Sequence, residues 1–175
     1  MIIAVDLDRT LIKTDMFQES MLLLIKKNPL YVFSILFWLL RGRAFAKRKI
    51  AQRISFAPET LPYNRELLNW LKTRKQDRLV LATATDQGLA EKIAAHVGIF
   101  EAVHGSDGHS NLKAGKKRAF LIQHYGAGNY AYIGDSRADM AIFKDSNGYG
   151  FVGLNPRLKE KVKKMNPSPC LIDLF

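Results

Sequence analysis

Two pairs of aspartates, each directly after a short apolar run, constrain the fold of this chain most. Asp6 and Asp8 follow the first apolar run of the chain, and Asp135 and Asp139 follow another run far downstream. Runs of this kind predict buried strands, and open parallel sheets gather their chemistry where the strands end. Four carboxylates meeting there would repel one another without a cation. We therefore expect a hard divalent metal, most simply Mg²⁺, held by oxygen ligands between the pairs.

The rest of the chain alternates short apolar runs with helical patterns of about ten residues. Gly98 and Gly126 stand where two of these patterns stop, as is typical of helix ends. Strands that alternate with helices predict an α/β fold with a doubly wound, Rossmann-like parallel sheet. The expected strands are 2–5, 79–82, 102–104, 130–133 and 149–152, and the expected helices of this part are 64–74, 86–97, 115–125 and 136–144.

The segment between the first two strands differs in composition from the rest. Residues 15–53 are helical in composition, with interruptions near Asn28-Pro29 and at Gly42. No Asp or Glu occurs from Ser20 to Pro58, although the net charge of the whole chain is +11 and eight Lys and Arg lie in this segment. Such a charge favours an anionic partner, which could be a phosphate ester, nucleic acid or an acidic membrane surface.

Within this segment, residues 30–40 form an apolar run that is too short to cross a bilayer, which takes about 18 to 20 residues. Two interpretations stay open. The run is either a buried helix of a small cap, or part of a hydrophobic hairpin that dips into an anionic membrane surface with its basic flanks on the headgroups. Nucleic acid is disfavoured, because the aromatic residues alternate with Leu and Ile as in a core. A single cysteine, Cys170, and no secretory leader at Met1 predict a cytoplasmic setting.

The first acidic pair has the residue types that phosphoryl chemistry needs. Asp6 is the candidate nucleophile, because an ionised carboxylate can attack phosphorus and form an aspartyl phosphate. Asp8, two residues on, can protonate the leaving oxygen and later deprotonate a water. Thr10 would steady this loop beside the phosphate. The alternative for such a pair is a turn in which the carboxylates bind backbone amides.

The second pair and two further residues complete the candidate site. Asp135 would bind the metal, and Asp139, one helical turn later, would orient its surroundings from the second shell. The alternative is that Asp135 or Ser136 caps a helix and Asp139 interacts favourably with the helix dipole. Thr83, with the backbone amide of Ala84, could bind phosphate oxygens. Lys117 could neutralise both the phosphate and the carboxylates, and Lys113 and Lys116 are its rivals for that role.

The ordered set Asp-x-Asp-x-Thr, strand-end Thr, helix-start Lys and Gly-Asp-x-x-x-Asp resembles the four motifs of the haloacid dehalogenase-like (HAD) hydrolase superfamily. The resemblance covers residues 1 to about 155. It implies that Asp6 is the nucleophile, that Asp8 is the acid and base, and that Thr83 and Lys117 bind phosphate. It also implies that Mg²⁺ is held by Asp6, the carbonyl of Asp8 and Asp135. Lys117 is preferred over its rivals because the family's lysine commonly stands four residues before a leucine, here Leu121.

The resemblance also implies a division of the chain and a reaction. A HAD-like core would comprise 1–14 and 64–165, a helical cap 15–63 and a C-terminal tail 166–175. An acid at position 8 favours a Mg²⁺-dependent phosphatase over a dehalogenase, with a phosphotransferase or mutase as the alternative within the fold. The family usually has Gly where Arg9 stands, which makes the geometry of that loop an open question.

Further segments, among them Arg41-Gly42-Arg43 and Ser106-Asp107-Gly108, resemble the soluble hydrolase module that accompanies membrane prenyltransferases of the ubiquinone-pathway type. This narrower resemblance implies peripheral association with the inner face of a membrane or with such a prenyltransferase. Together with the basic, apolar cap it suggests an amphiphilic, isoprenoid-linked or lipid-linked phosphate as substrate. The alternative from another class is a catalytically idle module that docks through its cap. The physiological ester and the oligomeric state stay open.

Overall fold

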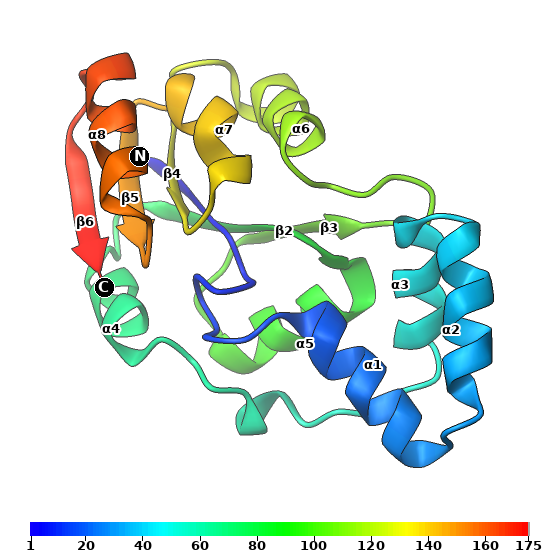
Figure 1. Cartoon of the computed structure of the whole chain (residues 1–175). Coiled ribbons are helices and arrows are strands. Elements are labelled where there is room, and N and C mark those ends of the chain that lie inside the picture. The colour runs from blue at the N-terminus through cyan, green and yellow to red at the C-terminus, as the bar shows by residue number, and fades with distance from the viewer. Residues whose placement is uncertain (175) are drawn as a thin grey trace.

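The core of the protein is a six-stranded sheet in which all neighbouring strands are parallel, as seen in a computed structural model that describes residues 1–174 (Figure 1). The strand order is β3-β2-β1-β4-β5-β6. The doubly wound α/β sheet expected from the sequence is therefore confirmed. The strands are β1 Ile2–Val5, β2 Arg78–Asp86, β3 Ala102–Ser106, β4 Tyr130–Gly134, β5 Gly148–Val152 and β6 Cys170–Leu174.

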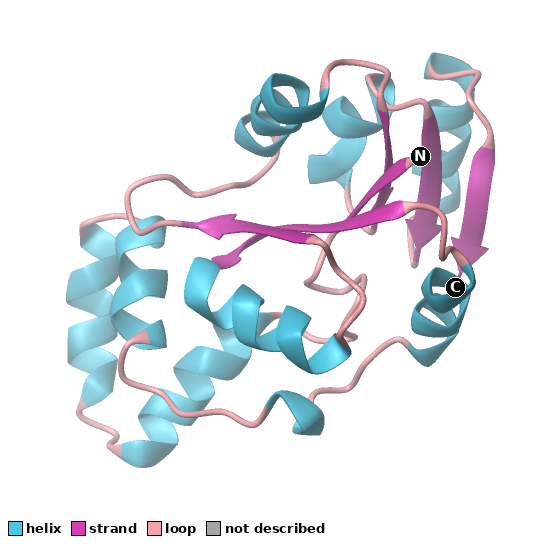
Figure 2. Cartoon of the chain, turned by 180° about the vertical axis from the view of Figure 1, so that it is seen from behind, coloured by secondary structure: helices cyan, strands magenta, loops and turns pink. Residues whose placement is uncertain are grey.

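Helices cover both faces of the sheet because successive residues of each buried strand point to opposite sides. Ile3 and Val5 of β1 pack in one cluster with α4 (Arg65–Thr73) and α5 (Gln87–Val97). Ala4, between them, belongs to the cluster of the other face. Figure 2 shows helices on both sides of the strands. The helices of that second face are α6 Gly115–Tyr125, α7 Met140–Lys144 and α8 Pro156–Met165.

The order of the strands positions the site. Val5 of β1 is in register with Leu81 of β2 on one side and with Ile133 of β4 on the other. The chain runs outward from β1 to β3 and then crosses to β4, so that the direction of winding reverses between β1 and β4. Open α/β sheets bind ligands at such a switch point, beyond the carboxyl ends of the strands. Both acidic pairs of the sequence follow these two strands.

The cap consists of three helices inserted after β1, and the interruptions between these helices lie where the sequence predicted them. The helices are α1 Met16–Lys27, α2 Tyr31–Leu40 and α3 Arg43–Ala51. Gly42 between the last two has a φ of +110°, which favours glycine. Leu24, Ile35 and Ile50, one from each helix, form the small core of the cap. A short 3₁₀ turn, η1 (Pro58–Thr60), lies on the way back to α4. Among residues 1–174, no helix has the length and apolar character required to cross a membrane.

Three expectations for the carboxyl-terminal half need correction. The expected C-terminal tail 166–175 contains β6, which pairs with β5 and completes the sheet. The helix α8 was not anticipated, although Asn155 caps it and Pro156 begins it. The single helix expected over 136–144 is a 3₁₀ turn, η2 (Arg137–Asp139), followed by α7. Residue 175 lies outside the described part of the chain.

Candidate active site

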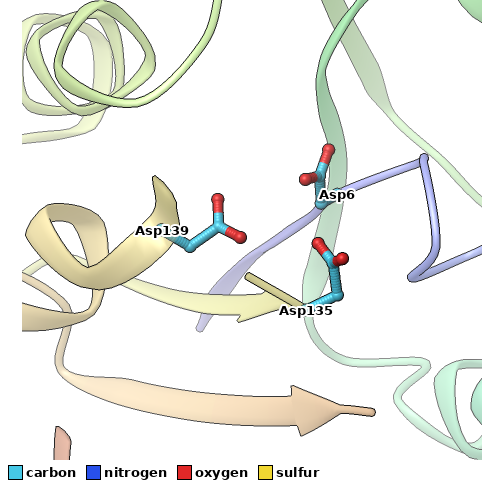
Figure 3. Close-up of side chains that lie close together, drawn as sticks. All are labelled: Asp6, Asp135 and Asp139. Carbon is cyan, nitrogen blue, oxygen red and sulfur yellow. The ribbon is translucent and has the colours of Figure 1, made fainter. Parts of the chain in front are cut away.

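Three of the four predicted carboxylates meet beyond the ends of β1 and β4 (Figure 3). Asp6 follows β1 directly, Asp135 follows β4, and Asp139 lies at the end of η2. Each offers an oxygen, and these oxygens all lie within 4.8 Å of one another. The backbone N–H of Asp6 donates to the carbonyl of Ile133 at 3.0 Å, which fixes the tip of β1 against β4. The two strand ends therefore come close enough for their acids to share one ion, as the sequence predicted.

Lys117, on the first turns of α6, is the lysine that reaches this cluster. Its Nζ lies 2.9 Å from Oδ1 of Asp6, and the side chain is buried. The same Nζ donates to the hydroxyl of Tyr132 at 2.9 Å, and this hydroxyl donates to Oδ1 of Asp139 at 2.9 Å. Asp139 is further held by Ser136, whose backbone N–H and hydroxyl both bond to Oδ2. A buried network thus fixes the lysine and two of the acids before any ligand binds.

Asp139 takes part in a helix cap and also lies beside the other two acids. With Ser136 it forms a capping box at the start of η2, so the helix-capping alternative is realised. Its carboxylate nevertheless lies within 4.8 Å of Asp6 and Asp135. Because protein donors already engage both of its oxygens, Asp139 is suited to orient the neighbouring groups, as expected of a residue in the second shell.

Asp8 lies in the same pocket but is held separately from the cluster. Its Oδ1 accepts the backbone N–H of Met16 at 2.7 Å, and its Oδ2 accepts the hydroxyl of Thr85 at 3.0 Å. Burial raises the pKa of Asp8, although the bond from Met16 opposes this. A carboxyl that retains its proton more readily than usual is suited to act as a general acid.

The electrostatics of the cluster fit a divalent cation. Burial, with the nearby charges of Asp139 and Asp8, raises the pKa of Asp6 to about 7, against the opposing effect of Lys117. Burial and Asp139 likewise raise the pKa of Asp135 to about 6. One ammonium therefore does not compensate the buried negative charge. The donors that converge here are all carboxylate oxygens, which is the ligand set that Mg²⁺ prefers.

These residues line a cavity of about 140 Å³ between the core and the cap. The cap contributes Phe17, Arg43 and Lys47 to its wall, and the segment after β3 contributes Asn111 and Lys113. Lys47 ties the two sides together, because its Nζ donates to the carbonyl of Ala84 and, at 3.3 Å, to Oδ1 of Asn111. The cap thus closes the site on the side opposite the sheet.

The two threonines predicted to bind phosphate, Thr10 and Thr83, are fully buried and do not line the cavity. Thr10 is fully buried, does not line the cavity, and its hydroxyl has no hydrogen-bond partner among residues 1–174. Thr83 is also fully buried, and its hydroxyl accepts the backbone N–H of Thr85 at 3.0 Å. Ala84 does line the cavity, as does Lys113, while Lys116 is exposed and outside the lining.

The site residues that were not identified from the sequence include Lys47, Thr85, Asn111 and Tyr132. Thr85 could have been found, since it lies two residues after Thr83 at the end of the same strand and on the same side. Tyr132 precedes the second acidic pair but is indistinguishable in the sequence from an ordinary buried aromatic residue. Lys47 and Asn111 reach the cavity only through the docking of the cap and the course of a loop.

A parallel sheet with this switch point, four acids at its carboxyl edge and a helical cap after the first strand is the α/β, Rossmann-like fold of HAD hydrolases. The protein is similar to a HAD family hydrolase, t0658, from Salmonella enterica subsp. enterica serovar Typhi, with a TM-score of 0.65 and 13% identity over 96% of this chain and 66% of that one. It is similar to a phosphoserine phosphatase in its apo form, with a TM-score of 0.62 and 16% identity over 99% and 92% of the two chains. Likeness at such identities shows the fold.

In sequence, the chain is 31% identical over 161 residues to a protein of Sinorhizobium fredii (strain NBRC 101917 / NGR234) named Uncharacterized protein y4nM. The alignment covers 91% of this chain, and the chain spans 31% of the length of that relative. No protein-family model matches the sequence.

Proposed function

We propose that this protein is a phosphatase that hydrolyses a phosphate monoester through an aspartyl phosphate on Asp6. One observation carries the proposal: the carboxylate of Asp6 lies 2.9 Å from the ammonium of Lys117 and within 4.8 Å of oxygens of Asp135 and Asp139, on the wall of a cavity. A buried carboxylate beside a fixed cation and a cation-binding set is what attack on a phosphoryl group requires. The HAD fold, which phosphoserine phosphatase shares, supports the same reaction.

In the first step, an oxygen of Asp6 bonds to phosphorus while the bond from phosphorus to the ester oxygen breaks. The leaving oxygen takes a proton from Asp8, whose pKa is raised by burial. The hydroxyl of Thr85 now donates to Asp8, and by rotation it can accept from the protonated acid. Lys117 stays beside the carboxylate and balances the charge of the phosphoryl oxygens.

In the second step, Asp8 takes a proton from a water that attacks the phosphorus of the aspartyl phosphate. The bond between phosphorus and the Asp6 oxygen breaks, which releases inorganic phosphate and restores both carboxyl groups. Mg²⁺, held by Asp6 and Asp135 with Asp139 behind them, would neutralise the negative charges that otherwise repel the phosphate. The carbonyl of Asp8 as a further ligand stays a prediction. We favour hydrolysis over transfer to a second substrate, because water requires no second acceptor site.

The test is the release of phosphate from p-nitrophenyl phosphate in the presence of Mg²⁺. We expect Asp6→Asn to lower the rate by roughly 10⁴-fold or more and to abolish a phosphoprotein that is stable in acid and cleaved by hydroxylamine. Asp107→Asn is the matched control, since Asp107 caps the backbone of an exposed turn and lies outside the cavity lining. Turnover by Asp6→Asn close to that of the control would refute the role of Asp6, and no turnover by the unaltered chain would leave the idle docking module as the better account.

For the substrate, we propose an amphiphilic or isoprenoid-linked phosphate. The cavity wall itself is mainly charged, with Phe17 as its one aromatic side chain among the described residues. What supports an amphiphilic ester is the exposed apolar surface of the cap. Initial rates with prenyl phosphates and with short water-soluble esters test this class, and equal specificity for both would contradict it. Association with a membrane prenyltransferase stays a prediction of the sequence resemblance.

A further inference from the structure

The exposed large hydrophobic residues of this protein gather on one part of the cap. Of the nine in the described chain, eight lie between Leu22 and Leu40, on α1, α2 and the turn that joins them. Singly scattered apolar residues are normal on protein surfaces, whereas a contiguous group marks a site of interaction. We call this group the apolar patch, and it comprises Leu22, Leu23, Leu30, Val32, Phe33, Leu36, Phe37 and Leu40.

The helix α2 is apolar on both of its sides. Its inner side contributes Ile35, which is buried, and the partly buried Tyr31 and Trp38 to the core of the cap. Its outer side exposes residues spaced by three and four positions, with Phe33 71% and Leu40 87% exposed. A helix on the surface of a globular protein normally carries polar residues on its outer side. In Figure 1, α2 lies at the outer limit of the cap, away from the sheet. The outer side therefore has no partner within residues 1–174.

All charged residues between Ser20 and Pro58, the stretch of sequence that contains the apolar patch, are basic. Lys26 and Lys27 end α1 and are exposed, and Arg41 follows α2 and is exposed. No acidic residue occurs between Ser20 and Pro58 to balance them. A second copy of the chain placed on this face would bring the same cations together, which costs free energy. An anionic surface complements them.

We propose that the apolar patch docks on an anionic lipid bilayer. In this arrangement α2 lies in the plane of the interface with Phe33 and Phe37 among the acyl chains, and Lys26, Lys27 and Arg41 bind headgroups. The surface is interfacial, because α2 has ten residues and a spanning helix needs about 20. This inference goes beyond the hydrolytic activity and does not require it, since the apolar patch contributes no residue to the cavity lining.

Docking would place the active site close to the bilayer. The neighbouring helix α3 packs against α2 and supplies Arg43 and Lys47 to the cavity. Packed helix axes are separated by about 8–10 Å. The mouth of the cavity would thus stand about one helix diameter from the headgroups.

The test is sedimentation of the intact chain with vesicles of phosphatidylcholine that contain phosphatidylglycerol, compared with vesicles of phosphatidylcholine alone. We expect binding only to the anionic vesicles, weakened by salt. Phe33→Ser/Phe37→Ser should lower the affinity at least about tenfold, as two large side chains no longer leave water. Lys26→Gln/Lys27→Gln should lower it by up to about fivefold per charge.

The matched control for charge is Lys161→Gln/Lys164→Gln, which removes two exposed lysines from α8, in the core rather than in the cap. We expect this variant to bind vesicles like the unaltered chain. The proposal is overturned if the unaltered chain ignores anionic vesicles, or if the double Phe variant binds as well as the control. It is equally overturned if the Phe residues prove necessary for a dimer, measured by sedimentation velocity, and not for vesicle binding.

Turnover of p-nitrophenyl phosphate, measured on the same samples, separates this inference from the proposed function. The Phe and Lys pairs lie outside the cavity lining, so we expect all three double variants to retain the rate of the unaltered chain. A chain that binds vesicles without turning over the ester would refute the phosphatase and leave the docking surface standing.

Discussion

The hydroxyl of Tyr132 offers a direct measure of how much the buried network stabilises the protein. Tyr132 is fully buried on β4 and joins Lys117 to Asp139 through two hydrogen bonds of 2.9 Å each. Tyr132→Phe removes both bonds and changes little else in shape. A hydrogen bond to a charged group contributes about 1.5–3 kcal/mol net, and unpaired buried groups lose more. In this variant Lys117 still contacts Asp6, and Asp139 still accepts a hydrogen bond from Ser136. We therefore take the lower value for each bond and expect the free energy of unfolding to fall by about 3 kcal/mol.

The same strand provides the control. Tyr130 is also fully buried, but its hydroxyl has no hydrogen-bond partner among residues 1–174. Tyr130→Phe therefore removes a buried polar group without breaking a bond and should leave the free energy of unfolding unchanged or raise it. Urea unfolding followed by circular dichroism measures both variants in metal-free buffer. If the two variants differ by less than about 0.5 kcal/mol, the network does not hold the site together as described.

Two further predictions concern charge and backbone at the same site. Without metal, the contribution of Asp6 and Asp135 to the free energy of unfolding should fall by roughly 6 kcal/mol as the pH rises from about 4 to 7, because raised pKa values of about 7 for Asp6 and about 6 for Asp135 keep protons on the folded state that the unfolded state has lost. Urea unfolding at several pH values measures this fall, and we expect it to be smaller with Mg²⁺ bound or in Asp6→Asn. A fall in Asp6→Asn equal to that of the unaltered chain would contradict the raised pKa of Asp6. Arg9 has a φ of +58°, so Arg9→Gly should be more stable than Arg9→Ala by about 1 kcal/mol; thermal unfolding that ranks Ala above Gly would refute the strain at this position.

The convergence of the acids could be predicted because it follows from local patterns. Short apolar runs followed by aspartates fix where strands end, and parallel strands place those ends at one edge. The breaks of the cap at Pro29 and Gly42 were equally readable, since both residues interrupt helices by their own backbone chemistry. Arg9 shows the limit of such reasoning, because only the structure reveals that the position has the left-handed backbone that glycine would favour.

Other features depended on contacts that no local pattern encodes. β6 is an edge strand that pairs with β5 alone. In the sequence, its short apolar stretch follows the turn-forming segment Asn166 to Pro169 and was therefore interpreted as part of a tail. α8 carries many lysines, and its apolar Leu158 and Val162 are spaced as in a helix, which was a signal that could have been used. Lys47 enters the site only because α3 docks against the end of β2.

The charge of the cavity distinguishes a phosphate ester from an acidic membrane surface, two of the three anionic partners that the composition suggested. Five acidic and five basic side chains line it, so its formal charge is zero when all are ionised. A phosphate that enters with Mg²⁺ is then matched locally, and the site contributes nothing to the net charge of +11 of the whole chain. The excess positive charge of the chain therefore lies outside the cavity. A net charge of this kind governs association with other surfaces rather than folding. Part of it lies beside the apolar patch, in a segment without any acid, where it would attract an anionic bilayer independently of catalysis.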